Sequence, residues 1–507
     1  MMIQNSSESF LSLPDLAARH LGGMVLAASD EFFAQKENLL NDGEPVWDAD
    51  AYTDRGKWMD GWESRRKRVA GYDWAVIRLG LPGLVRGVLV DTAYFTGNFP
   101  ESCSIEGCWA PDATEVSDLL NREWVEILPN QTLQGNNKHY FPITCPLRLT
   151  HVRLNIYPDG GVARLRVHGN VLPSPASLSH DTQLDLVSLL YGGEIVSVSD
   201  AHYGPPHNLL LPTRGVNMKD GWETKRRRGP GHDWAIIRMA CSGIIRRAIV
   251  DTSHFKGNYP ESCSIETCSV TSEADLLNDN VWKPLLERTR LRAHFEHLYT
   301  EDDLLHQEPA THVRLKSFPD GGISRLRLFG ELSVEGRMEI GLRRLNAMWP
   351  TEAHKVFLSI CQSRHWAESM VQARPFVSVE ALQEQALEHW NVLQSSDWLE
   401  AFAGHPRIGQ KKAATDQSAQ SHQWSKQEQA SMDTAADTVQ EELAAANERY
   451  FEKFGYIFIV CATGKSPQEM LDILNSRLPN DADTELPIAA GQQAEITALR
   501  LEKWLKQ

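Results

Sequence analysis

The sequence predicts a multidomain protein in which two tandem β-sandwich domains of the jelly-roll type are followed by an all-α domain. Three observations predict this fold class. A long stretch of sequence occurs twice, each copy is rich in short β-like runs broken by turn signals, and the last third is dominated by helix formers. We expect the first repeat to span residues 1–171, the second repeat 178–335 and the helical domain 340–507.

The internal repeat is the strongest signal in the chain. The motif Asp-Gly-Trp-Glu at 60–63 returns at 220–223, and residues 97–106 return with little change at 257–266. Both pairs stand 160 positions apart, so the segment between them holds its register without an insertion or deletion. A period this long exceeds solenoid units of about 20–50 residues and indicates a duplicated domain.

Strands are predicted within each repeat from apolar runs and turn signals. Residues 74–79 and 84–90 are apolar and partly alternating, and Pro-Asp-Gly-Gly at 158–161 lies between two alternating runs, as a hairpin turn does. Many short strands per repeat favour a sandwich or jelly roll. Residues 172–177, with their prolines and serines, are expected to link the repeats.

Helix formers take over from about residue 345. Ala, Glu, Gln and Leu dominate residues 379–387 and 437–454, and the polar stretch 425–432 has a similar composition. Residues 495–504 are typical of a last amphipathic helix. This third of the chain is therefore predicted to be all α.

Charge and hydropathy narrow the classes of function. With 51 basic and 67 acidic residues the net charge is −16, which disfavours a generic binder of nucleic acid or anionic membranes. No apolar run approaches the roughly 18–20 residues of a membrane helix. The N-terminus is too polar for a secretory signal. We therefore expect a cytoplasmic protein without nucleic-acid or membrane partners.

Eight cysteines in 507 residues are too few for a disulfide scaffold. Four of them form one Cys-x4-Cys pair per repeat, at 103 and 108 and again at 263 and 268. A four-thiolate zinc site is conceivable, but such sites usually cluster their ligands more tightly. Buried, unreactive thiols are the preferred interpretation.

A polar motif with several cations recurs in both repeats. Asp60 and Glu63 are followed by four basic residues at 65–68, and the copies of these acids are followed by four more at 225–228. An acid, an aromatic ring and several cations can bind a small polar anion, because arginine presents a planar fork to a carboxylate. A solvated run of surface charge is the alternative. A binding site is favoured by polar residues that recur at the same spacing, namely Asn98, Glu101, Ser102 and Glu106.

These motifs, together with 73–80, 91–102 and 164–166, resemble the allantoicase family over roughly residues 10–335. The resemblance implies two jelly-roll domains of the galactose-binding-like kind and the hydrolysis of allantoate to ureidoglycolate and urea. The candidate bases for activating water are Asp60, Glu63, Glu101 and Glu106, or their copies in the second repeat, with Glu63 and Glu101 as the catalytic candidates. Which repeat is active, and whether a divalent metal takes part, stays open at this point. The candidates for holding the substrate are Arg66, Arg226, Asn98, Asn258 and Glu261.

Two aligned positions differ between the repeats in a way that bears on proton transfer. Tyr72 aligns with His232, and Tyr94 aligns with His254. If a histidine transfers the proton, the second repeat is the better candidate and His232 is a catalytic candidate; otherwise these are packing or surface positions. No His-Glu-x-x-His or comparable cluster appears, so we assign no metal ligands.

In the helical part, residues 401–409 interrupt the helical pattern as a loop, with His405 immediately before Pro406. Twenty residues on, Ser425, Glu428 and Gln429 stand at i, i+3 and i+4, and hence on one helix face. A histidine that faces a carboxylate is a common acid/base pair at neutral pH. A lone structural histidine is the alternative.

Residues of about 340–507 resemble the decarboxylase of 2-oxo-4-hydroxy-4-carboxy-5-ureidoimidazoline (OHCU). The resemblance is carried by the histidine loop and the helix face just described, together with Trp366, 374–376, 447–458 and 499–501. The resemblance implies a cofactor-free α-helical enzyme that yields (S)-allantoin. By this analogy His405 is the acid/base and Glu428 orients it or shares its proton. The implied substrate-binding residues are Pro406, Ser425, Gln429 and Arg500.

Both parts thus point to a bifunctional enzyme of ureide catabolism after urate oxidation. The two reactions are not consecutive, because ring opening of allantoin lies between them, so a separate allantoinase is an expected pathway neighbour. Small-molecule ureides are the expected ligands, and we expect a homo-oligomer. The alternative is an OHCU decarboxylase whose duplicated sandwiches are a non-catalytic ureide-binding or scaffolding module.

Overall fold

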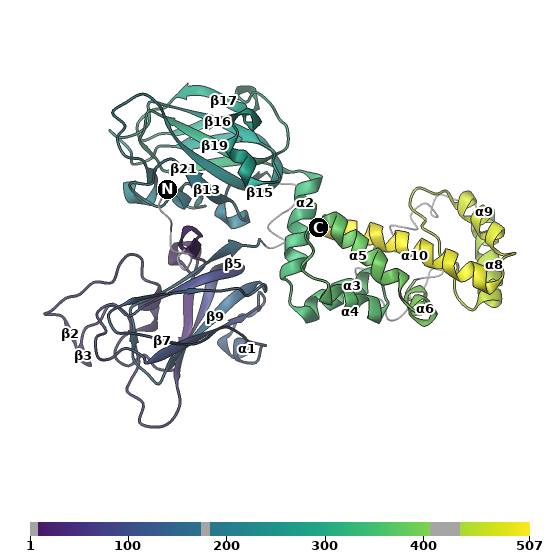
Figure 1. Cartoon of the computed structure of the whole chain (residues 1–507), viewed down its shortest axis with the longest axis horizontal. Coiled ribbons are helices and arrows are strands. Elements are labelled where there is room, and N and C mark those ends of the chain that lie inside the picture. Colours follow the sequence, from purple (N-terminus) through teal and green to yellow (C-terminus); the bar gives the residue numbers. More distant parts are fainter. Residues whose placement is uncertain (1–8, 174–182, 406–436) are drawn as a thin grey trace. The chain divides into compact units, whose positions relative to one another are not determined.

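The computed structural model describes residues 9–173, 183–405 and 437–507, and the chain divides into two compact units, Met1–Arg337 and Met338–Gln507. The first unit contains the β-strands and the second is helical (Figure 1). The expected fold class, two tandem β-sandwiches followed by an all-α domain, is confirmed. None of the helices in the described ranges is both long and apolar enough to cross a membrane.

The first repeat is built around one long strand, β5 (Asp73–Asp91). The first half of β5 lies between β1 and β9, and its second half lies between β8 and β11. The pairing with β9 shifts between Arg78 and Gly83, where β5 passes from one layer of the sandwich to the other. The other elements are β1 (Met24–Ala28), β2 (Tyr52–Thr53), β3 (Gly56–Lys57), β4 (Trp62–Glu63), β6 (Ser102–Cys108), α1 (Val116–Leu120), β7 (Val125–Thr132), β8 (Lys138–Pro142), β9 (Leu149–Tyr157), β10 (Gly161–Val162) and β11 (Arg164–Val171).

The structure corrects two local predictions. The runs 74–79 and 84–90 are not separate strands, because the residues between them stay extended within β5. The segment 158–161 is not a hairpin turn: β9 and β11 both pair with β5, and β10 pairs with β4. This turn instead carries the chain from one layer to the other.

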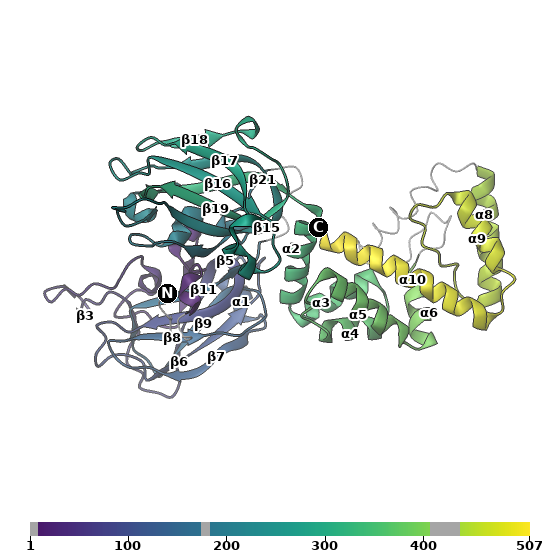
Figure 2. The ribbon, with the colours of Figure 1, turned by 45° about the horizontal axis from the view of Figure 1, so that its top comes forward.

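The second repeat reproduces this plan around β15 (Asp233–Asp251), which has the same 19-residue length as β5. Its pairing with β19 shifts between Arg238 and Gly243, at the aligned position. Figure 2 shows β15, β16, β17 and β19 side by side. The remaining strands are β12 (Leu184–Asp185), β13 (Glu194–Val198), β14 (Trp222–Glu223), β16 (Ser262–Cys268), β17 (Lys283–Arg290), β18 (Glu296–Tyr299), β19 (Ala310–Phe318), β20 (Gly322–Ile323) and β21 (Arg325–Leu332).

In the helical unit a buried apolar core is shared by several helices. Ser378 caps α5 by accepting from the Ala381 N–H, and Asp481 caps α10 by accepting from the Thr484 N–H at 2.8 Å. The long helix α10 packs against α3, α5 and α6. The helices are α2 (Val334–Ala347), α3 (Pro350–Ile360), α4 (Arg364–Gln372), α5 (Val379–Asn391), α6 (Ser395–Ala403), α8 (Asp437–Phe454), α9 (Pro467–Arg477) and α10 (Ala482–Leu505).

The predicted helices 379–387 and 437–454 fall in α5 and α8, and 495–504 is the last part of the longer α10. Residues 401–403, predicted as a loop, form the final turn of α6. The predicted segments 425–432 and, for the most part, 172–177 lie outside the described residues.

Candidate active sites

The Asp-Gly-Trp-Glu motif positions a carboxylate by burying the neighbouring tryptophan. Trp222 is fully buried, and its indole N–H donates to the Asp200 carbonyl at 2.9 Å. Successive strand residues point to opposite faces, so the anchored Trp222 fixes the direction of Glu223. Trp62 is buried in the same way, and its N–H donates to the Asp30 carbonyl at 2.8 Å.

A pocket of about 720 Å³ opens beside Glu223 in the second repeat. Its walls come from the segment after β13, from β14, from the β15–β16 connection, from the end of β17 and from the β19–β20 turn. The lining residues are His202, Tyr203, Glu223, Thr224, Lys225, Arg226, Gly257, Asn258, Tyr259, Glu261, Arg290, Leu291, Pro319, Asp320 and Gly321. Three of the predicted residues, Arg226, Asn258 and Glu261, are thus brought together.

Glu223 and Asn258 form a carboxylate–amide pair in this pocket. The Asn258 amide donates to Glu223 Oε1 at 2.6 Å. The loop that carries Asn258 is held by the Gly322 N–H, which donates to the Asn258 carbonyl at 2.7 Å. A side chain at Gly321 (φ +133°) would bring its Cβ to 2.7 Å from that carbonyl, so this close approach requires glycine.

Cations surround the pair. Lys225 and Arg226 are exposed, and no side-chain hydrogen bond or ion pair is formed by either one with the rest of the described chain. Arg290 Nε lies 3.3 Å from Glu261 Oε1, and its side chain is 90% exposed. Cationic side chains that lack a protein partner are suited to bind an anion from solvent.

Glu261 is an unsuitable base because its charge is already satisfied. Its carboxylate accepts from Ser262 Oγ at 2.6 Å and from Arg288 Nη2 at 3.1 Å. The Ser262 hydrogen bond, followed by that from Arg288, holds the pKa of Glu261 below its ordinary value. This carboxylate therefore orients the arginines along β17.

The corresponding region of the first repeat keeps the pair but not its surroundings. Asn98 donates to Glu63 Oε1 at 2.7 Å, and Glu63 is only 8% exposed. Burial raises the pKa of Glu63, partly offset by the Asn98 hydrogen bond. The polar residues His202, Tyr203, Tyr259 and Arg290 are replaced there by Phe32, Phe33, Phe99 and Thr132.

The cation beside Glu63 is also engaged. Arg65, the counterpart of Lys225, lies 2.6 Å from Asp30 Oδ2 through Nη2 and covers the Phe32 ring at 5.2 Å. Arg66, the counterpart of Arg226, is exposed. The pocket of the second repeat is therefore the more polar of the two regions.

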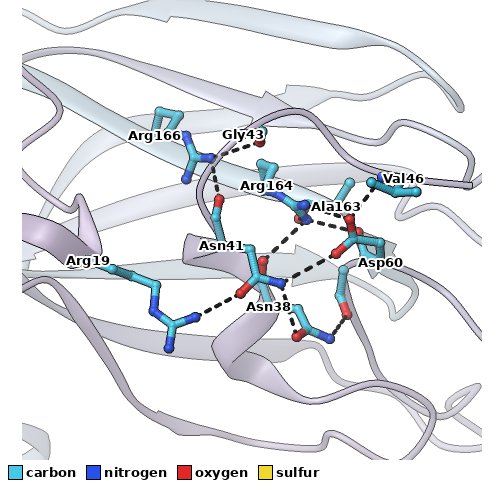
Figure 3. Close-up of polar contacts among 10 residues, drawn as sticks. Arg19, Asn38, Asn41, Gly43, Val46, Asp60, Ala163, Arg164 and Arg166 are labelled. Carbon is cyan, nitrogen blue, oxygen red and sulfur yellow. Dashed lines mark hydrogen bonds and ion pairs between the residues drawn. The ribbon is translucent and has the colours of Figure 1, made fainter. Parts of the chain in front are cut away.

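Two other acids of the repeated motifs are structural. Asp60 Oδ2 lies 2.7 Å from Arg164 Nη2 and also accepts from the Val46 N–H (Figure 3). Burial opposes ionisation of Asp60, but Arg164 and the Val46 amide outweigh it and lower the pKa. Glu106 is bound by Arg153 and Asn155 on the face of the sheet.

The remaining predicted residues of this part lie elsewhere. Glu101 is exposed, and its backbone N–H donates to the Tyr157 carbonyl. His232 is not among the residues that line the pocket; its ring packs against Phe318 at 5.0 Å, and burial together with Lys316 lowers its pKa. His254 is also outside the lining, and its Nε2 lies 2.9 Å from the Gly215 carbonyl oxygen.

The paired cysteines do not form a zinc site. All four are buried free thiols, and burial raises the pKa of Cys103 and Cys263 to about 12 and that of Cys108 and Cys268 to about 11. Within the described ranges, no group of three or more His, Cys, Asp and Glu side chains is placed to hold a metal ion. The buried-thiol interpretation therefore holds.

In the helical unit, His405 follows the end of α6. Its backbone N–H donates to the Phe402 carbonyl at 3.1 Å. Burial and the positive charge of Arg500 lower the pKa of His405 to about 3, opposed by the amide of Gln493. The imidazole is therefore neutral at physiological pH. This low pKa differs from the expectation, drawn from the sequence, of a histidine that acts as an acid/base at neutral pH.

Arg500 is 2% exposed, and its Nη1 donates to the Ile360 carbonyl at 3.3 Å. Gln493 and Arg500 stand at i and i+7 of α10, on one face with Thr497. Sequence reasoning missed Gln493 and Thr497, although polar residues at this spacing among apolar neighbours were a usable signal. The predicted residues Pro406, Ser425, Glu428 and Gln429 lie outside the described residues.

Comparison with known proteins gives consistent results. The family model "Allantoicase repeat" matches residues 14–172 and 184–333, and the model "OHCU decarboxylase" matches 346–502. A probable allantoicase of Pseudomonas aeruginosa is 51% identical over 62% of this chain and 95% of its own length. A probable allantoicase 1 of Burkholderia mallei is 47% identical over 65% of this chain and 97% of its own. The crystal structure of allantoicase from Saccharomyces cerevisiae is 34% identical, covers 64% of this chain and 98% of its own, and gives a TM-score of 0.54.

Fold and site together define a multidomain enzyme in which a duplicated β-sandwich part with a carboxylate–amide pocket precedes an α-helical part with a half-buried histidine. The chain belongs to the allantoicase family. Its C-terminal part is an OHCU decarboxylase domain. It therefore combines a hydrolase with a carboxy-lyase of ureide catabolism.

Proposed function

We propose that this chain hydrolyses allantoate in the pocket of the second repeat and decarboxylates OHCU beside His405. One observation carries the first assignment: the Glu223–Asn258 pair shares its pocket with Lys225 and Arg226, whose charges no described residue neutralises. The substrate would be a small anion with hydrogen-bonding arms, as allantoate is with its carboxylate and two ureido groups.

For the hydrolysis, Arg226 and Lys225 bind the substrate carboxylate. Glu223, held by Asn258, accepts a proton from water. The water oxygen then bonds to the central carbon of allantoate while the bond from that carbon to one ureido nitrogen breaks. Glu223 returns the proton to this nitrogen, so the products are ureidoglycolate and urea, and the carboxylate is regenerated.

For the decarboxylation, the half-buried neutral His405 is suited to accept a proton from the substrate and to return one at carbon. A substrate anion beside it would raise the pKa of the imidazole, whereas Arg500 lowers it. The electron pair left by carbon dioxide passes into the heterocyclic ring, so this proposal requires no cofactor. Arg500 would hold the carboxylate or a ring oxygen.

The cellular setting follows from the same chemistry. We propose a cytoplasmic enzyme, which agrees with eight cysteines that are all free thiols. A separate allantoinase would open the allantoin ring between the two reactions. We also propose a homo-oligomer, which light scattering of the purified chain tests.

The test is to incubate the purified full-length chain with allantoate, with and without a chelator, and to measure urea. We expect urea release well above the uncatalysed background, and the chelator arm decides whether a divalent ion takes part. The absence of urea in both arms, with a folded protein, contradicts the hydrolase assignment and favours a ureide-binding role for the sandwiches.

The separateness of the two sites has its own test. His405→Ala should abolish accelerated decarboxylation and leave urea release unchanged. Loss of both activities in a folded variant contradicts a two-site enzyme.

A further inference from the structure

One face of α10 carries three polar side chains into the core beside His405. Gln493, Thr497 and Arg500 are all buried there, and Gln493 is fully inaccessible to solvent. The Gln493 Nε2 donates to Thr497 Oγ1 at 3.3 Å. Its carbonyl oxygen Oε1 is buried without a hydrogen-bond partner of good geometry. Buried acceptors without partners are rare in native proteins, so this oxygen calls for an explanation.

The imidazole of His405 supplies one. The amide of Gln493 interacts with the imidazole of His405 and favours protonation of the ring, against burial and Arg500. A neutral imidazole has one N–H donor and one nitrogen acceptor. Since Gln493 Nε2 is directed to Thr497, Oε1 is the amide atom that is left to accept from the ring.

We propose that Gln493 is a positioning residue for His405: its amide oxygen accepts the imidazole N–H and thereby fixes which ring nitrogen offers its lone pair to the substrate. The partner of one ring nitrogen sets the tautomer, and hence the chemistry, of the other. This inference rests on the proposed role of His405 in decarboxylation.

The Gln493 amide also contacts a second polar side chain on the same helix. Thr497 accepts from Nε2 and also interacts with the buried thiol of Cys361, which follows α3. In the structure Nε2 of Gln493 faces the Thr497 hydroxyl, which leaves Oε1 on the other side of the amide. This is the amide orientation that the proposal needs.

Two substitutions in the full-length chain test the inference, with OHCU as substrate. Gln493→Leu removes the acceptor at similar volume and should lower kcat at least about tenfold with little change in KM, as a lost proton-transfer geometry does. Gln493→Glu keeps an acceptor and adds negative charge beside the ring. It should retain more activity than Gln493→Leu and raise the apparent pKa in the pH profile of kcat.

The matched control is Gln372→Leu, the same exchange at an exposed position at the end of α4, which should leave decarboxylation unchanged. Urea release and the circular dichroism spectrum report on folding. If Gln493→Leu does not fold, the pH profile of Gln493→Glu alone decides.

Wild-type kcat and pH profile in a folded Gln493→Leu would overturn the inference. So would equal losses in both variants with no change in the pH profile, which indicate a structural role only. If His405→Ala retains full decarboxylation, the proposed function of His405 fails instead, and the two failures are thus distinguishable.

Discussion

The two sandwich repeats share the same arrangement of strands, but the side chains around the glutamate of the Asp-Gly-Trp-Glu motif differ. β5 and β15 have equal length and pass between layers at aligned positions. Both repeats hold a glutamate by an asparagine amide, at 2.7 Å and 2.6 Å. In the first repeat the glutamate is buried beside phenylalanines, whereas in the second it faces a pocket with cations.

The difference teaches that the carboxylate–amide pair alone does not define an active site. Burial raises the pKa of Glu63 and shields it from water, which a general base needs to reach. Arg65 is occupied by Asp30, whereas Lys225 is not bound by the aligned Asp200 through its side chain. Two properties therefore distinguish the repeats: whether water can reach the glutamate, and whether the neighbouring cation lacks a protein partner.

The largest effect is expected from removing the base. Glu223→Gln should lower kcat for allantoate hydrolysis by about 10²–10⁴-fold, because the amide cannot accept the proton from water. The matched variant Glu63→Gln should change kcat little. Urea release from allantoate measures both. Equal losses would show that both repeats are active or that Glu223 is not the base.

A smaller effect is expected from the proposed carboxylate clamp. Arg226→Ala should raise KM for allantoate by about tenfold, which corresponds to ~1.4 kcal/mol of lost binding. Arg66→Ala should have almost no effect. Initial rates over a range of allantoate concentrations separate KM from kcat. Small, equal changes in the two variants would remove the clamp assignment.

Arg290 offers a finer comparison, because Thr132 occupies its position in the first repeat. Arg290→Thr should raise KM only about two- to fivefold, since an exposed ion pair contributes little. The reverse exchange Thr132→Arg should leave the kinetics unchanged. A loss of kcat in Arg290→Thr would instead assign this side chain to the chemical step.

The smallest effect concerns a property that the repeats share. His151 and His312 each lie 2.9 Å from a threonine hydroxyl, and burial lowers the pKa of both to about 4. Their charged form is disfavoured in the fold, so the stability they contribute is complete above about pH 6.5 and is lost as the pH falls toward 4.

Thermal unfolding between pH 4 and 7 measures this contribution. His151→Asn and His312→Asn should each flatten the dependence of the unfolding midpoint on pH, and by a similar amount. An unchanged slope in both variants would show that other groups govern the loss of stability in acid.

Much of the fold could be predicted from the sequence because the repeat fixes the domain plan before any strand is assigned. The joining of two runs into β5 could not, because an extended backbone through residues 79–82 depends on partners in both layers. In the helical part the run 437–454 could be predicted from composition alone, since all of these residues lie in α8, which ends at Phe454.

Only those residues of the candidate site that recur in both repeats could be predicted from the sequence. Searching for residues that recur in both repeats finds Asn258 and Glu261, and it necessarily overlooks positions that differ, such as His202 and Arg290. His232 does differ between the repeats, but its ring packs against Phe318 rather than in the pocket. Contact geometry separates such cases, and a single sequence does not contain it.

The close contact between a glycine and an asparagine carbonyl is present in both repeats, at Gly160 with Asn98 and at Gly321 with Asn258. The position of the asparagine is therefore set by main-chain atoms and does not depend on the side chains that surround the glutamate. Those side chains can be exchanged without a change in the main chain that positions the asparagine. The two repeats can therefore keep the same main-chain frame around the asparagine while the side chains around it differ.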